Sequence, residues 1–114
     1  MTAPVTVDAD TPAVINVRAY HGDSWSQTFR FLDNNLPVDL TGATVESHAR
    51  GTLADTTPLT VTVLDPTDGQ IQIGPPGGGL EPDRYTYDVQ VDQAGGVRTW
   101  VSGWLRVYAD ITDA

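Results

Sequence analysis

The feature that most constrains the fold of this chain is a series of segments in which apolar and polar residues alternate with a period of two. The last segment, residues 98–108, has bulky side chains at both sets of alternate positions. A strand directs successive side chains to opposite faces, so one face can cover a core while the other stays open. The expected inward set is Val97, Val101, Leu105 and Val107, and the expected outward set is Arg98, Trp100, Trp104, Arg106 and Tyr108.

The outward set has the composition of a protein-binding surface. Trp, Tyr and Arg are enriched at the buried centres of interfaces, where they supply large contact areas. The pattern therefore predicts an interface built from Arg98, Trp100, Trp104, Arg106 and Tyr108. One alternative stays open: a β-bulge at Gly103 would change the register and send one or both Trp residues into the core.

Six further segments have strand character, and turn residues separate them. Within residues 24–32, for example, Trp25, Phe29 and Phe31 share one face. Asp, Asn, Pro and Gly between such segments favour turns. The segments are residues 14–20, 24–32, 43–50, 59–63, 70–73 and 84–92. No segment has a convincing helical period, so the sequence predicts an all-β protein, an immunoglobulin-like β-sandwich of about seven antiparallel strands.

The length of 114 residues fits one domain with a single core. Residues 1–12 contain two prolines and no sustained period, and we expect them to form an extended N-terminal arm. Residues 13–114 then form a single β-sandwich domain. An extended arm can add backbone hydrogen bonds to the sheet of a neighbouring protein, so we expect the arm to contribute to assembly.

Composition narrows the classes of partner. The formal net charge is −9, all six basic residues are Arg, and Cys is absent. An acidic surface repels phosphate backbones and anionic lipids, so we expect neither nucleic acid nor membrane as a partner. The absence of Cys excludes disulfides and thiolate metal sites. No signal peptide and no membrane-spanning segment are indicated.

No catalytic residues can be assigned. His21, Asp23 and Ser24 are close in sequence, but near-adjacent strand residues diverge and cannot form a triad. The run from Glu46 to His48 fails because Ser47 points away from both neighbours. The chain is therefore expected to be non-enzymatic and to need no cofactor.

Metal binding is also not assigned. Asp65 and Asp68 share one turn, and Asp33 lies beside two Asn residues in another, which gives oxygen ligands of the kind calcium accepts. Turns prefer these same residues, however, and no full calcium-loop spacing is present. We therefore expect no metal site.

Several short elements occur in a characteristic order. Gly22-Asp23 precedes an aromatic strand; residues 37–43 (PVDLTGA), 65–69 (DPTDG) and 80–88 (LEPDRYTYD) follow, and Gly103 comes before Leu105 and Val107. Over roughly residues 20–110, this order resembles the small immunoglobulin-like domains of tailed bacteriophages, and it is similar to the N-terminal domain of the phage baseplate upper protein family. The resemblance implies a virion part without enzymatic activity that docks on other structural proteins. No downstream stalk is present in this chain, so an accessory module of the capsid, neck or tail is expected.

The expected function is thus that of a phage virion structural protein, a capsid decoration or head accessory protein or a tail or baseplate component. Its expected partners are major capsid, neck or tail proteins, and it can also form a homo-oligomer on the particle. The alternative is a carbohydrate-binding module for adhesion to the host surface. In that case Trp100, Trp104 and Tyr108 would form a platform for sugar rings.

Overall fold

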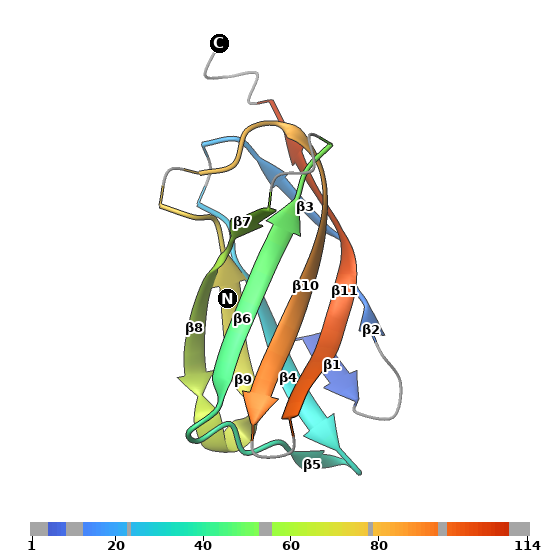
Figure 1. Ribbon diagram of the computed structural model, residues 1–114, viewed down its shortest axis with the longest axis vertical. Helices are drawn as coiled ribbons and strands as arrows, with labels where there is room; N and C mark the ends of the chain where they lie inside the picture. The colour runs from blue at the N-terminus through green and yellow to red at the C-terminus, as the bar shows by residue number, and fades with distance from the viewer. Residues whose placement is uncertain are drawn as a thin grey trace.

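The computed structural model describes residues 5–8, 13–22, 24–52, 56–77, 79–93 and 96–109. Over these residues the chain forms two β-sheets packed against each other, with one short 3-10 turn, η1 (Pro66–Asp68), and no α-helix (Figure 1). The predicted all-β sandwich is confirmed. No helix in the described ranges is long and apolar enough to cross a membrane.

The strands divide between a sheet of five and a sheet of six in the described part of the chain. Sheet A has the order β1 (Val5–Asp8), β4 (Gln27–Asp33), β9 (Gln70–Gly74), β8 (Thr60–Asp65), with β5 (Leu36–Pro37) also paired to β4. Sheet B has the order β2 (Ala13–Val14), β11 (Gly96–Tyr108), β10 (Asp83–Gln93), β6 (Thr44–Arg50), β7 (Thr56–Pro58), with β3 (Val17–Tyr20) also paired to β11. The long hairpin of β10 and β11 forms the centre of sheet B (Figure 1).

The N-terminal strands depart from the expected antiparallel pattern. β1 pairs with β4 in parallel, and β2 and β3 both pair with β11 in parallel. Val7 of β1 is 1% exposed and belongs to the core. Residues 5–8 of the expected arm are therefore a strand of the sandwich, and the boundary predicted at residue 12 does not separate them from the domain. Residues 1–4 and 9–12 lie outside the described residues.

The core forms where the inward faces of the two sheets meet. Sheet A contributes Phe29 and Phe31, both fully buried, as the alternation in residues 24–32 predicted. Trp100 of sheet B packs on Phe31 with ring centroids 5.0 Å apart. Other buried members include Ile71, Ile73, Tyr87, Val89, Val91, Val101 and Leu105. Aromatic and β-branched side chains fill this interior because they pack well on a pleated surface.

The predicted turns are confirmed at the two positions that show it best. Asn34 and Asn35 both have positive φ, 55° and 64°, as the two central residues of a tight β4–β5 hairpin require. In the η1 turn, the Asp65 side chain accepts a hydrogen bond from the Asp68 backbone N–H. Gly69 closes this turn with φ 68°, and a Cβ there would lie 2.7 Å from the Phe31 carbonyl oxygen, so glycine is required.

A tyrosine corner closes one end of sheet B. The Tyr85 hydroxyl donates to the Glu81 carbonyl oxygen at 2.6 Å, a bond from a Tyr hydroxyl to the backbone a few residues upstream that is typical of this motif. Tyr87 instead donates to the carbonyl oxygen of Ile15, also at 2.6 Å. This second bond ties β10 to the segment between β2 and β3, so it fixes the N-terminal strands against the β10–β11 hairpin.

Candidate interface on the outer face of sheet B

A β-bulge in β11 decides which side chains reach the outer face of sheet B, the face turned away from sheet A. Val89 of β10 pairs with Val101, whereas the next residue, Gln90, pairs with Thr99. Trp100 is therefore the extra residue on β11. It is 6% exposed, and Val101 beside it is fully buried, so two consecutive side chains face the core. The bulge lies at Trp100, three residues before the position considered from the sequence.

The bulge overturns three sequence-based assignments. Trp100 is a core residue, not an outer-face residue. Arg98 pairs with Val91, whose side chain faces the core, and its guanidinium lies 4.6 Å from the ring centroid of Trp100. Val97 was expected in the core but is 64% exposed. It pairs with Asp92, which points outward. The reason is the same for all three: a single extra residue reverses the alternation on its N-terminal side.

The rest of the predicted set lies on the outer face. Trp104 is 38% exposed, and Arg106 and Tyr108 follow it on the same side of β11. Just before Trp104, a Cβ on Gly103 would collide with the carbonyl oxygen of Ile15. Glycine at this position thus allows the N-terminal segment to lie close against β11. The backbone N–H of Trp104 donates to the side-chain oxygen of Asn16 at 3.1 Å.

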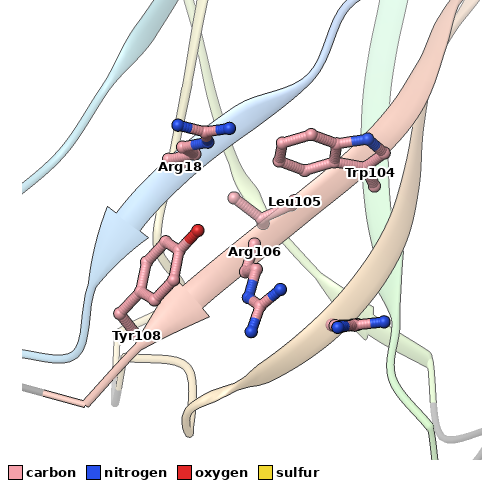
Figure 2. Close-up of a pocket in the computed structure, with 6 residues that line it drawn as sticks. Arg18, Trp104, Leu105, Arg106 and Tyr108 are labelled. Atoms are coloured by element: carbon pink, nitrogen blue, oxygen red, sulfur yellow. The ribbon is translucent and has the colours of Figure 1, made fainter.

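Neighbouring strands contribute residues that sequence reasoning did not assign to the site. Arg106 of β11 lies between Arg84 of β10 and Arg18 of β3, each a direct cross-strand partner. Tyr108 pairs with Tyr20 in the same way, with ring centroids 5.6 Å apart. Figure 2 shows Arg18 on β3 beside the side chains of β11. Residues of these three strands line one surface pocket: Arg18, Arg84, Trp104, Leu105, Arg106 and Tyr108.

We call Arg18, Arg84 and Arg106 the arginine row. Like charges directly opposite each other on a sheet are destabilising, so the row opposes folding. Aromatic rings offset part of this cost: the Arg18 guanidinium lies 5.7 Å from the Trp104 ring centroid, and that of Arg106 lies 4.9 Å from the Tyr108 centroid. Over the described ranges, no carboxylate forms a salt bridge with any member of the row.

The carboxylate nearest in sequence is held elsewhere. Asp83 precedes Arg84 in β10, so its side chain leaves the opposite side of the strand. It accepts hydrogen bonds from the backbone N–H and the hydroxyl of Thr52, at 3.1 and 3.0 Å, and from the Arg84 backbone N–H. These bonds hold the pKa of Asp83 below its ordinary value. Asp83 is thus an anion used for local structure and does not neutralise the arginine row.

The turn carboxylates also have structural partners. Asp68 accepts from Arg30 at 2.8 Å and from Gln70 at 2.6 Å, and its pKa is lowered, chiefly by the bond from Arg30. Asp65 accepts from Thr67. No three His, Cys, Asp or Glu side chains gather into a possible metal site within the part of the chain that the structure describes.

The two sequence clusters considered for catalysis do not form catalytic groups among the described residues: their side chains point to opposite faces or bond to backbone carbonyl oxygens. Ser47 is 2% exposed and its hydroxyl donates to the Asp88 carbonyl oxygen. Glu46 and His48 lie on the opposite side of β6, as the alternation predicted. The Nδ1 atom of His21 lies 2.7 Å from the Leu80 carbonyl oxygen, and Asp23 lies outside the described residues.

These features define a class: a β-sandwich that exposes a basic, aromatic sheet face. No protein-family model matches the chain, and no curated protein is significantly similar in sequence. Among solved structures, the N-terminal domain of phage TP901-1 ORF48 is similar, with a TM-score of 0.58 and 12% identity over 91% of this chain and 95% of that one. At this identity the likeness establishes a common fold. InlP of Listeria monocytogenes gives a TM-score of 0.44 at 19% identity, over 84% of this chain and 26% of that chain; a score this low does not indicate a common fold.

Proposed function

We propose that this chain is a structural component of a tailed-phage particle, without enzymatic activity, that docks on neighbouring proteins through the outer face of sheet B. The observation that carries the proposal is the exposed surface formed by Trp104 and the arginine row. Aromatic and Arg side chains at the centre of a face are typical anchors of protein interfaces. No carboxylate of the described residues forms a salt bridge with the arginine row, which favours a partner with negative charge.

The fold supports the phage assignment. The N-terminal domain of phage TP901-1 ORF48 shares the sandwich over nearly the full length of both chains. The order of motifs in the sequence also resembles the baseplate upper protein family. The fold is compatible with a capsid decoration protein and with a component of the neck, tail or baseplate.

Carbohydrate binding is the second candidate, and the exposed Trp104 and Tyr108 rings are the observation that favours it. A sugar platform needs free ring faces. Arg18 and Arg106 stack on these two rings, and the third expected platform residue, Trp100, is buried. These contacts make the face better suited to a protein with acidic groups than to a neutral sugar.

The test is the incorporation of variants into virions of the phage that encodes the chain. Trp104→Ala removes the central aromatic side chain of the face, and we expect it to be lost from purified particles. Leu36→Ala is the matched control because Leu36 is 66% exposed on β5, in the other sheet. We expect the control to be retained at the wild-type level.

Cryo-electron microscopy of particles with and without the protein would then identify its position. Density lost from the head would assign a capsid decoration protein, and density lost from the tail tip a baseplate component. Particles that never contain the wild-type protein would refute the proposal. Glycan binding by the purified chain that is lost in Trp104→Ala would then support the carbohydrate-binding function.

A further inference from the structure

The charges on the outer face of sheet B are segregated along the strands. The arginine row crosses β10, β11 and β3 at one end. Towards the other end lie two carboxylates, Glu46 of β6 and Asp92 of β10, and a third, Asp88 of β10, lies between the two ends. Glu46 and Asp92 are exposed and Asp88 is half-buried. The face therefore carries both of the charges that a complementary surface would need.

The two ends are related by the strand register. On β10, Arg84 and Asp92 each lie four residues from Asp88, an even number, so all three share the outer face. On β6, Arg50 and Glu46 each lie two residues from His48. Asp88 and His48 are direct cross-strand partners. One line across the sheet through Asp88 and His48 thus lies midway between positive and negative positions on both strands.

We propose that the outer face of sheet B binds the same face of a second copy of this chain, with Arg84 of each copy over Asp92 of the other. This inference rests on the proposed function and names the partner at the docking face. A two-fold axis that lies in the interface along the line through Asp88 and His48 superposes Arg84 on Asp92 of the second copy. The same rotation superposes Arg50 on Glu46.

Charge selects this arrangement over the other face-to-face pairing. A two-fold axis parallel to the strands would put one arginine row over the other. Two unit charges about 4 Å apart interact by about 4 kcal/mol at an effective dielectric constant near 20, so that pairing is strongly opposed. The axis across the strands instead puts Arg84 over Asp92 and Arg50 over Glu46, and it places Arg106 over Val97, the β11 partner of Asp92. At its centre Asp88 meets Asp88, and each of these carboxylates has His48 as its cross-strand neighbour.

The same rotation gives Trp104 a place to pack. Trp104 pairs with Thr86, and Thr86 and Gln90 are symmetric about Asp88. The indole would therefore lie over the row that contains Gln90 and Thr99 of the second copy. These side chains are shorter than an indole, and their row leaves room for one. The interface would then have an aromatic anchor on each side of its axis, as isologous contacts require.

The area of the face sets the expected strength of the contact. The four strands β6, β10, β11 and β3 span about 19 Å at the usual strand spacing, and the eight steps from Arg84 to Asp92 span about 27 Å. The two copies together would bury roughly 1,000 Å², at the lower end of specific interfaces. We therefore expect a dimer with a Kd of the order of tens of micromolar, which high local concentration on a particle would stabilise.

The test is sedimentation equilibrium of the full chain between about 10 and 500 µM at low salt, since weak dimers dissociate on dilution. Wild type should be monomeric at the lower limit and dimeric at the upper one. Because the contacts are between charges, 0.5 M NaCl should weaken dimerisation at least tenfold. A chain that stays monomeric throughout would overturn the inference.

Charge reversal makes the test specific to this geometry. Arg84→Asp and Asp92→Arg should each abolish dimerisation, because each puts two like pairs into the interface. The double variant, and an equimolar mixture of the two single variants, should restore it. Asp33→Arg is the matched control, since Asp33 is exposed at the end of β4 in sheet A. Dimerisation by the single variants, or failure of restoration in chains whose circular dichroism is native, would contradict the inference.

Failure of this inference and failure of the proposed function give different results. A monomeric chain that is still incorporated into virions in a Trp104-dependent manner would retain the proposed function and assign the face to another, acidic virion protein. A dimeric chain that never enters virions would retain the inference and refute the proposed function.

Discussion

The replacement of each of two tryptophans by alanine tests the register of β11. Trp100 is 6% exposed and packs on Phe31, whereas Trp104 is 38% exposed and contacts Arg18 on the outer face. Replacing a buried Phe or Trp by Ala typically costs about 3–5 kcal/mol, because apolar contacts are lost and a cavity remains. Trp104→Ala leaves no closed cavity and removes one cation–π contact, which is worth about 0.5–1 kcal/mol at an exposed site.

The expected difference between the two variants is therefore about 2–4 kcal/mol in the free energy of unfolding. For a domain near 100 residues, 1 kcal/mol corresponds to about 4–8 °C in Tm. Trp100→Ala should thus lower Tm by more than about 10 °C, and Trp104→Ala by a few degrees. Urea unfolding followed by far-UV circular dichroism is the suitable assay, since tryptophan fluorescence changes with the substitution itself.

A second core variant protects the comparison in case Trp100→Ala does not fold. Trp100→Phe keeps an aromatic ring against Phe31 and should retain the fold while losing about 1–2 kcal/mol. Equal destabilisation by Trp100→Ala and Trp104→Ala would refute the assignment of one residue to the core and one to the surface. So would a Trp100→Ala protein as stable as wild type.

Two further perturbations test the close approach at Gly103 and the hydrogen bonds of two carboxylates, Asp68 and Asp83. Gly103→Ala should destabilise the fold by about 1–3 kcal/mol, because the new Cβ meets the Ile15 carbonyl. The Ile15 amide donates to the Ser102 carbonyl at 2.9 Å, and its hydrogen exchange should become faster in this variant. Unchanged exchange would contradict the close approach. Lowering the pH should reduce Tm below about pH 4: the pKa values of Asp68 and Asp83 are depressed in the folded state from 3.8, so their contribution is present above 3.8 and is lost as pH falls through the folded values. Thermal melts from pH 7 to pH 2 would measure this, and a flat profile would count against these hydrogen bonds.

The predictable part of the structure was encoded by local alternation. Phe29 and Phe31 occupy alternate positions of one strand, and both are buried. Tyr87, Val89 and Val91 follow the same pattern in β10 and are buried too. Turn chemistry was equally local, because the Asp65 cap and the positive φ of Gly69 depend on residues within a few positions. Such features need no knowledge of what a strand pairs with.

The bulge at Trp100 was not predictable in this way. It shows only in the pairing with the neighbouring strand, where Val89 of β10 pairs with Val101 and Gln90 pairs with Thr99, so that Trp100 is an extra residue. The sequence around Gly103 suggested a bulge, since glycine often marks one. Gly103 is instead required by the close approach of Ile15, a contact between segments more than 80 residues apart. A single extra residue then moved Arg98 and Trp100 off the predicted face.

The neighbours of Arg106 also depend on pairing that sequence patterns do not specify. Alternation places Arg18 and Tyr20 on one side of β3, but the parallel pairing of β3 with β11 brings them beside Arg106 and Tyr108. The pairing of residues 5–8 was likewise not predictable from local sequence patterns. Their four-residue strand pairs with β4 because Val7 fills a place in the core, and no turn signal joins the two strands.

The placement of arginines separates structural from functional use of charge in this protein. Arg30 shows the structural use, since its guanidinium lies 2.8 Å from the Asp68 carboxylate and fixes the η1 turn. Four of the six arginines, Arg18, Arg50, Arg84 and Arg106, lie on the outer face of sheet B in a chain of net charge −9. Folding alone would favour spreading so few cations among fifteen acidic residues. Arg18, Arg84 and Arg106 are aligned across adjacent strands. This alignment is the one expected if, as proposed above, an acidic surface meets this face during assembly and removes the repulsion among these three residues.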